Sequence, residues 1–301
     1  MTRTRSVTFL DTRIIMDLPT TVTRSDSQVN SLDARLLVSR LASKLSQPYG
    51  LGSMSISIYD TAWVAMVSRT TGSTSEFLFP ESFQYLLQSQ SPDGSWEVYA
   101  SQVDGILNTA AGLLALIKHQ IAEPLLCDSN LPTEINYRIN KAQESLGKQL
   151  QGWNLEICDH VGFEILVPAL LDMLEAEGLK LDFPARSSLM EINNEKLCRF
   201  NSEVLYGPHQ TTMLHSLEAF IGKIEFDRVS HHKVHGSLLA SPSSTAAYLM
   251  NCQIWDEDAE AYLRRTVAGG TGSGGVPCAF PTTNFEITWV SKSAASLHLV
   301  N

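Results

Sequence analysis

The 301-residue sequence has few basic residues, no long hydrophobic run and no closely paired cysteines. Lysine and arginine number 22 against 32 aspartates and glutamates, a formal net charge of −10, so no basic stripe is available for nucleic-acid phosphates. The longest nearly unbroken apolar stretch, residues 110–117, is far shorter than the roughly 20 residues that span a bilayer. We therefore expect neither a nucleic-acid partner nor a membrane span.

The cysteines and the N-terminal segment both indicate a reducing compartment. Five scattered cysteines without Cys-x-x-Cys spacing fit neither a disulfide framework nor a zinc site. Residues 1–17 contain arginines and aspartates but no continuous apolar core, so the sequence shows no secretory signal. These two features predict a cytoplasmic protein.

The hydrophobic pattern has a helical period. At 44% hydrophobic and 18% charged residues the chain is too apolar for a disordered protein, and β-branched alternation is nearly absent. Residues 1–30 are predicted to form a loosely ordered head, and a first helix follows at 32–45. Further helices are expected at 59–67, 82–90, 104–119, 161–177, 210–226, 241–252 and 256–267, with a polar break at 68–75. The sequence thus predicts an all-α protein, and an α/α barrel is one way to close its helix hairpins.

Residues 90–96 (QSPDGSW) form a motif whose physical role can be read directly. Gly94 permits a sharp turn after a helix, because glycine adopts positive φ angles without strain. The Gln90 amide can bond to exposed backbone groups at helix ends, and the Trp96 indole can stack against them. We therefore expect this motif to fasten helix ends together.

Three further motifs accompany it along the chain. They are residues 57–65 (SIYDTAWVA), residues 214–218 (LHSLE) with 241–246 (SPSSTA), and residues 274–281 (GGVPCAFP) with 285–289 (FEITW). Taken together and in this order, the four motifs resemble those of diterpene cyclases of the copalyl diphosphate synthase and kaurene synthase type. The fungal bifunctional cyclases are the most similar group.

The resemblance implies an architecture and an activity. It implies a terpenoid cyclase fold in which an α-barrel γ domain is inserted into a β domain, with the class II active site between them. Residues 31–74 would begin the β domain, residues 75–290 would form the γ domain, and residues 291–301 are a divergent tail that looks truncated. The implied reaction is the cyclisation of geranylgeranyl diphosphate in diterpenoid biosynthesis, with Mg²⁺ as the cofactor.

The aspartate motifs that the family uses for catalysis are absent from this sequence. Class II cyclases protonate an alkene with the middle aspartate of Asp-x-Asp-Asp, and class I cyclases ionise the diphosphate at Asp-Asp-x-x-Asp. No two aspartates are adjacent here, and residues 256–258 (DED) are the nearest approach. We expect a cyclase-like chain that cannot protonate its substrate alone. The alternative is a non-catalytic fragment that binds an isoprenoid diphosphate or complements a separate cyclase half.

Four residues match positions to which the family assigns roles at the active site. His215 matches a histidine that accepts the final proton, and Cys278 matches the position of that histidine's partner in the substrate pocket. Lys196 matches a lysine that contacts the diphosphate. Glu164 matches an acidic position linked to magnesium and substrate binding.

Each of these residue types also has a plainer interpretation. A histidine such as His215 is more often a buried, hydrogen-bonded core residue, and Lys196 fits a solvated surface lysine equally well. A carboxylate inside an apolar run is costly unless it is paired, which favours a specific role for Glu164. His231 and His232, with His235 nearby, have the spacing of metal ligands, but an exposed polar turn is the favoured interpretation.

Overall fold

The computed structural model describes residues 54–71, 74–96, 101–122, 131–158, 160–269, 273–286 and 288–289, together with the isolated Leu36. The predictions for the head at residues 1–30, the helix at 32–45 and the tail at 291–301 lie outside the described residues, apart from Leu36. Within the described part of the chain, no helix is both long and apolar enough to cross a membrane.

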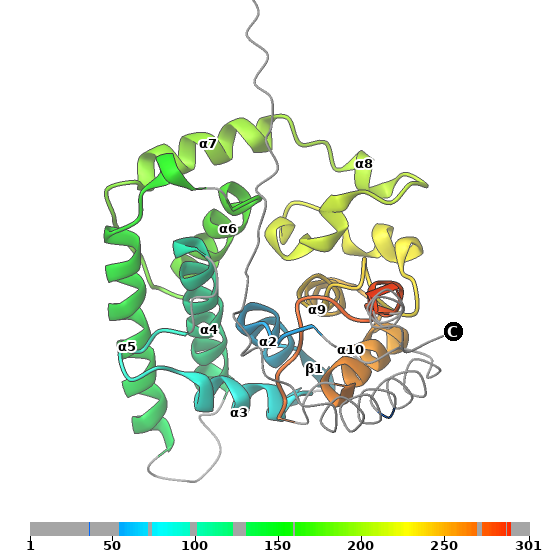
Figure 1. The fold of residues 1–301 in the computed structure, drawn as a ribbon, viewed down its shortest axis with the longest axis horizontal. Coiled ribbons are helices and arrows are strands. Elements are labelled where there is room, and N and C mark those ends of the chain that lie inside the picture. The colour runs from blue at the N-terminus through cyan, green and yellow to red at the C-terminus, as the bar shows by residue number, and fades with distance from the viewer. Residues whose placement is uncertain are drawn as a thin grey trace, which may run out of the picture.

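The described chain consists mainly of helices, which confirms the prediction of an all-α protein (Figure 1). The α-helices are α2 (Ile58–Ala65), α3 (Pro80–Ser89), α4 (Gln102–Ala122), α5 (Leu131–Gln151), α6 (Phe163–Ala176), α7 (Arg186–Cys198), α8 (Glu203–Tyr206), α9 (Pro242–Asn251) and α10 (Glu257–Gly269). The 3₁₀ helices are η1 (Leu155–Ile157), η2 (Thr212–His215), η3 (Leu217–Phe220) and η4 (Phe226–His232).

The polar segment at 68–75 is not a simple break between helices, as the sequence pattern predicted. Strands β1 (Ser68–Thr71) and β2 (Thr74–Phe77) pair antiparallel there, with Ser68 opposite Phe77. These strands are mostly polar, so the alternation of apolar residues that reveals a half-buried strand is missing.

Helix α2 lies at the centre of the described fold, between α4 on one side and α9 on the other (Figure 1). It also contacts α3, and every residue of α2 except Tyr59 is buried. A helix that is apolar on all sides is stable only inside a protein, so the other helices surround this one. The start of α2 is thereby placed in the interior, where polar side chains require specific partners.

The motif at residues 90–96 fastens helix ends, as the sequence predicted. The Gln90 side-chain amide donates hydrogen bonds to the carbonyl oxygens of Gly94 at 3.0 Å and Arg138 at 3.1 Å. Trp96 is fully buried, and its indole N–H donates to the Leu86 carbonyl oxygen at 3.0 Å. The turn after α3 is therefore tied to both α3 and α5.

Candidate active site

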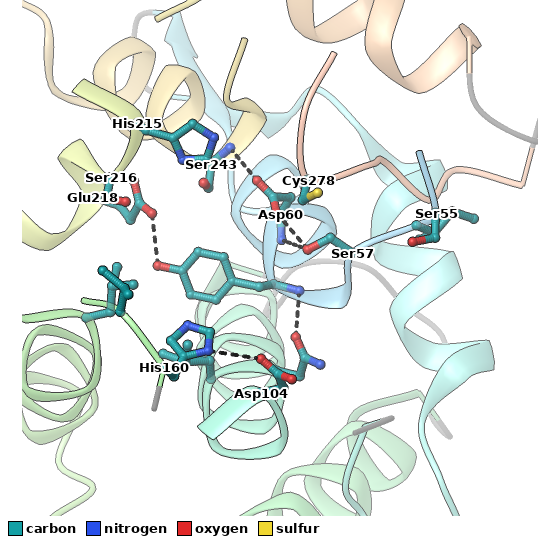
Figure 2. A pocket seen from close by; sticks show the side chains of 16 residues that line it. Ser55, Ser57, Asp60, Asp104, His160, His215, Ser216, Glu218, Ser243 and Cys278 are labelled. Carbon is teal, nitrogen blue, oxygen red and sulfur yellow. Dashed lines mark hydrogen bonds and ion pairs between the residues drawn. The ribbon is translucent and has the colours of Figure 1, made fainter. Parts of the chain in front are cut away.

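A cavity of about 450 Å³ lies at the N-terminal end of α2 (Figure 2). Its wall is built from the start of α2, the first turns of α4, the η2–η3 segment, the start of α9 and Cys278. Three of the four sequence motifs therefore converge on one cavity, although they are far apart in the sequence. In Figure 2, His215, Ser243 and Asp60 lie on one side, and His160 with Asp104 lies on the other.

The start of α2 is fixed by reciprocal hydrogen bonds. The Ser57 hydroxyl accepts a bond from the Asp60 backbone N–H at 3.2 Å and donates to Asp60 Oδ2 at 2.6 Å. The Ser243 backbone N–H donates to Asp60 Oδ1 at 3.1 Å, so α9 is joined to α2. The Val276 N–H donates to Thr61 Oγ1 at 3.0 Å, so the motif at residues 274–281 is also joined to α2. Asp60 thus has both carboxyl oxygens bonded in one orientation.

The η2–η3 segment corrects the sequence prediction of one helix over residues 210–226. Serine side chains of the SPSSTA motif bond to its backbone: Ser244 Oγ donates to the Leu214 carbonyl at 2.7 Å and accepts from the Leu217 N–H at 3.2 Å. Ser241 Oγ donates to the His215 carbonyl at 2.9 Å. These bonds occupy backbone groups that a continuous helix would pair, so two short 3₁₀ turns form instead.

His215 is held by its backbone, and its side chain is exposed at the cavity wall. The imidazole forms no hydrogen bond with any other residue that the structure describes. The interpretation of His215 as a buried core histidine is therefore wrong, because the short turns direct its side chain away from the core. Both ring nitrogens are available to a ligand.

Two buried carboxyl groups stand in the same wall. Asp60 is 4% exposed and Glu218 is 2% exposed. The Tyr59 hydroxyl donates to Glu218 Oε1 at 3.0 Å, whereas Glu218 Oε2 is buried without a hydrogen-bond partner in the described chain. Neither carboxyl group pairs with a lysine or arginine of the described residues. Such a pair is unusual, because buried charges normally have a counter-charge.

Burial raises the pKa values of three groups in this cavity wall. It raises the pKa of Glu218 to about 8, and the nearby Asp60 charge contributes to the same shift. Burial also raises the pKa of Asp60, although hydrogen bonds from Ser57 and Ser243 oppose the shift. The pKa of the Cys278 thiol rises through burial and the Asp60 charge. Near neutral pH, Glu218 is therefore mostly protonated.

A second cavity of about 530 Å³ adjoins the first one and shares Val161, Leu166 and Ser216 with it. Lys196 Nζ lies 3.0 Å from Glu164 Oε1, and both residues line this second cavity. The Lys196 side chain is 55% exposed, whereas that of Glu164 is 15% exposed. The second cavity thus places a cationic side chain beside the cavity that holds the buried carboxyl groups.

The structure places the four predicted site residues in two pairs. His215 and Cys278 line the first cavity, and Lys196 and Glu164 form an ion pair in the second. The sequence interpretation assigned no role to Asp60 and Glu218. The signal that could have found them was the one used for Glu164, a carboxylate inside an otherwise apolar run.

The donor groups do not fit a magnesium ion held by the protein alone. In the described part of the chain, no three His, Cys, Asp or Glu side chains are close enough to hold a metal. Glu164 is a single carboxylate that already pairs with an ammonium group. His231 and His232 bond instead to backbone carbonyls of Gly207 and Leu205, each at 2.9 Å.

Comparisons with known proteins agree with this geometry. No family model matches the sequence. Copalyl diphosphate synthase from Talaromyces verruculosus is 52% identical over 258 residues, which cover 85% of this chain and 27% of that protein. Over this region the chain is homologous to diterpene cyclases.

Solved structures support the same assignment of fold. The crystal structure of ent-copalyl diphosphate synthase from Arabidopsis thaliana matches with a TM-score of 0.66 and 27% identity, covering 87% of this chain and 35% of that one. Abietadiene synthase from Abies grandis matches with a TM-score of 0.68 and 29% identity, covering 86% of this chain and 33% of that one. The chain thus has the helical terpenoid cyclase fold that the motifs implied, and it spans about a quarter of the curated relative's length.

Proposed function

We propose that this chain provides part of the substrate cavity of a class II diterpene cyclase of the copalyl diphosphate synthase type, acting on geranylgeranyl diphosphate. The observation that supports the proposal is the convergence of three family motifs on one cavity, which a second cavity lined by a lysine adjoins. The relative from Talaromyces verruculosus, named for the same product, adds to this support.

In this proposal the side chains of the two cavities have separate tasks. The hydrocarbon chain occupies the first cavity, where it displaces water from the carbocations formed during ring closure. Lys196 binds the diphosphate as a mobile positive charge, and Glu164 orients that lysine. His215, whose ring nitrogens are free of described partners, accepts the final proton beside Cys278. The residues do not fit a protein-held magnesium ion, so no step depends on one.

A second candidate is a non-catalytic chain that binds an isoprenoid diphosphate or complements a separate cyclase half. The cavity itself favours this candidate: alkene protonation needs a strong acid, and neither aspartate that lines the first cavity, Asp60 or Asp104, belongs to an Asp-x-Asp-Asp motif. The assignment of residues 31–74 to a β domain and of 75–290 to a γ domain belongs to the same proposal. So does location in the cytosol, for which the thiols of Cys198, Cys252 and Cys278 are suitable.

The proposed function can be tested in a chimera. The chain would replace the matching segment of the Talaromyces verruculosus copalyl diphosphate synthase, and products from geranylgeranyl diphosphate would be dephosphorylated and analysed by gas chromatography with mass detection. We expect a bicyclic alcohol. His215→Ala is expected to lower its rate of formation about 100-fold, because a positioned general base is lost. The exposed His209, which lines neither cavity, provides the matched control His209→Ala. A folded chimera without product would contradict the proposal.

Binding of the diphosphate can be tested on the chain itself. We expect Lys196→Ala to weaken binding of geranylgeranyl diphosphate, measured by calorimetry, about tenfold, because one charge-assisted contact is lost. Lys180, which is 69% exposed and paired with Glu175, lies outside both cavities and gives the control Lys180→Ala. Equal affinities of the two variants for geranylgeranyl diphosphate would show that Lys196 does not bind the diphosphate.

A further inference from the structure

The buried carboxyl groups of Asp60 and Glu218 form no ion pair with a lysine or arginine of the described chain. Buried carboxyl groups normally face a lysine or arginine, and these two face none in the described chain. The charge of Asp60 raises the pKa of Glu218. The charges of both carboxyl groups raise the pKa of the neighbouring Tyr59 hydroxyl. Two such groups close together in a dry environment cannot both be ionised, so near neutral pH they retain one proton between them.

The hydrogen bonds indicate which member carries the negative charge. Asp60 accepts from the Ser57 hydroxyl and the Ser243 backbone N–H, and both bonds favour an ionised carboxylate. Glu218 accepts the Tyr59 hydroxyl on Oε1 and has no described partner on Oε2. This arrangement favours the proton on Glu218 and the charge on Asp60.

Both carboxyl groups line a cavity, so the unbalanced charge is close to any ligand there. The other titratable groups around the pair are Tyr59 on α2, His215 on η2, Cys278, and Asp104 with His160 across the cavity. Only histidines among them can carry a positive charge. His160 Nδ1 is already 3.3 Å from Asp104 Oδ1, and His215 is exposed to solvent. The Asp60 carboxylate thus has no lysine or arginine partner in the described chain, and the nearby cation that lowers its pKa is the solvent-exposed His215. Glu218 Oε2 has no hydrogen-bond partner among the described residues.

We propose that Asp60 and Glu218 share one proton, and that their single negative charge binds the positively charged centre of an isoprenoid ligand in this cavity. The ligand class rests on the function proposed above. A carbocation formed near His215, or a tertiary ammonium group that imitates one, would supply the missing counter-charge at low dielectric. The pair acts through its charge and is not itself required to accept the proton that the ligand loses.

The test compares two ligands of similar length on the purified chain. N,N-dimethylfarnesylamine carries a positive charge at neutral pH, whereas farnesyl methyl ether is neutral. We expect the wild-type chain to bind the amine at least about tenfold more tightly than the ether in calorimetry at neutral pH. Glu218→Gln should retain this preference, because glutamine imitates the protonated carboxyl group. The double variant Asp60→Asn with Glu218→Gln should lose it and bind both ligands equally.

Glu286→Gln provides the matched control, because Glu286 is also 2% exposed but lines neither cavity. Equal wild-type affinities for the two ligands would overturn the inference and leave the proposed function standing, as would an amine preference that survives in the double variant. Failure of the wild type to bind either ligand while it still binds geranylgeranyl diphosphate would overturn the inference alone. Failure to bind that diphosphate as well would overturn the proposed function.

An infrared measurement covers the case in which the double variant does not fold. The wild type should show a protonated-carboxyl band at neutral pH that Glu218→Gln lacks and Glu286→Gln keeps. Absence of that difference would overturn the assignment of the proton to Glu218.

Discussion

Gly94→Ala is expected to destabilise the protein by at least about 3 kcal/mol. Gly94 has a φ of +92°, and a Cβ atom built there would lie 2.2 Å from the backbone carbonyl carbon of Lys141 in α5. A contact this short with backbone cannot be relieved by rotating a side chain, so the turn after α3 would move away from α5. The free energy of unfolding in urea would measure the loss.

Gly178→Ala separates the two causes of this effect. Gly178 has a similar φ of +86°, but a Cβ atom there would meet nothing within 4 Å. The control variant should therefore lose only about 1 kcal/mol of stability, which is the cost of placing alanine in the left-handed conformation. Equal losses at Gly94 and Gly178 would show that the close approach of α5 contributes nothing.

Glu218→Gln is expected to stabilise the chain at alkaline pH. The pKa of Glu218 is about 8 in the folded protein, against 4.5 as its ordinary value. Because each pKa unit corresponds to about 1.4 kcal/mol, ionising this buried group costs up to about 5 kcal/mol of stability. Glutamine cannot ionise, and its side-chain oxygen can still accept the hydrogen bond from Tyr59.

The stability gain of Glu218→Gln should depend on pH in a definite direction. A carboxyl group whose pKa is raised by folding leaves stability unaffected below its unfolded pKa and lowers it as the pH rises toward the folded pKa. The two proteins should therefore differ little at about pH 4 and most at about pH 9 in thermal or urea denaturation. A gain of the same size at both pH values would contradict the assignment, since it would point to packing and not to ionisation.

Particular residues show how far the sequence could predict the site. His215 and Cys278 were found because they lie in motifs, and Lys196 and Glu164 because they match single family positions. These four residues line two adjoining cavities. The metal-like spacing of His231 and His232 was misleading on its own, because their rings bond to backbone carbonyls.

The fold was predictable where local sequence and helical period agree. Helix α4 was expected at 104–119 and is observed at Gln102–Ala122, and α9 was expected at 241–252 and is observed at Pro242–Asn251. Helices α5 and α7 were not predicted, because many polar residues weaken the apolar period that reveals a helix. The turns around His215 were missed, because they depend on the hydroxyl group of Ser244 from another segment.

By itself, the sequence determined the helical class, the family motifs and the fastening role of residues 90–96, since each depends on neighbouring residues. Only the tertiary structure decided that Asp60 and Glu218 are buried together. Tyr59 and Glu218 are 159 positions apart, and their hydrogen bond exists only after α2 is enclosed by α4 and α9. Solvent exposure and nearby charges set the proton affinity of a carboxyl group, and both are properties of the folded chain.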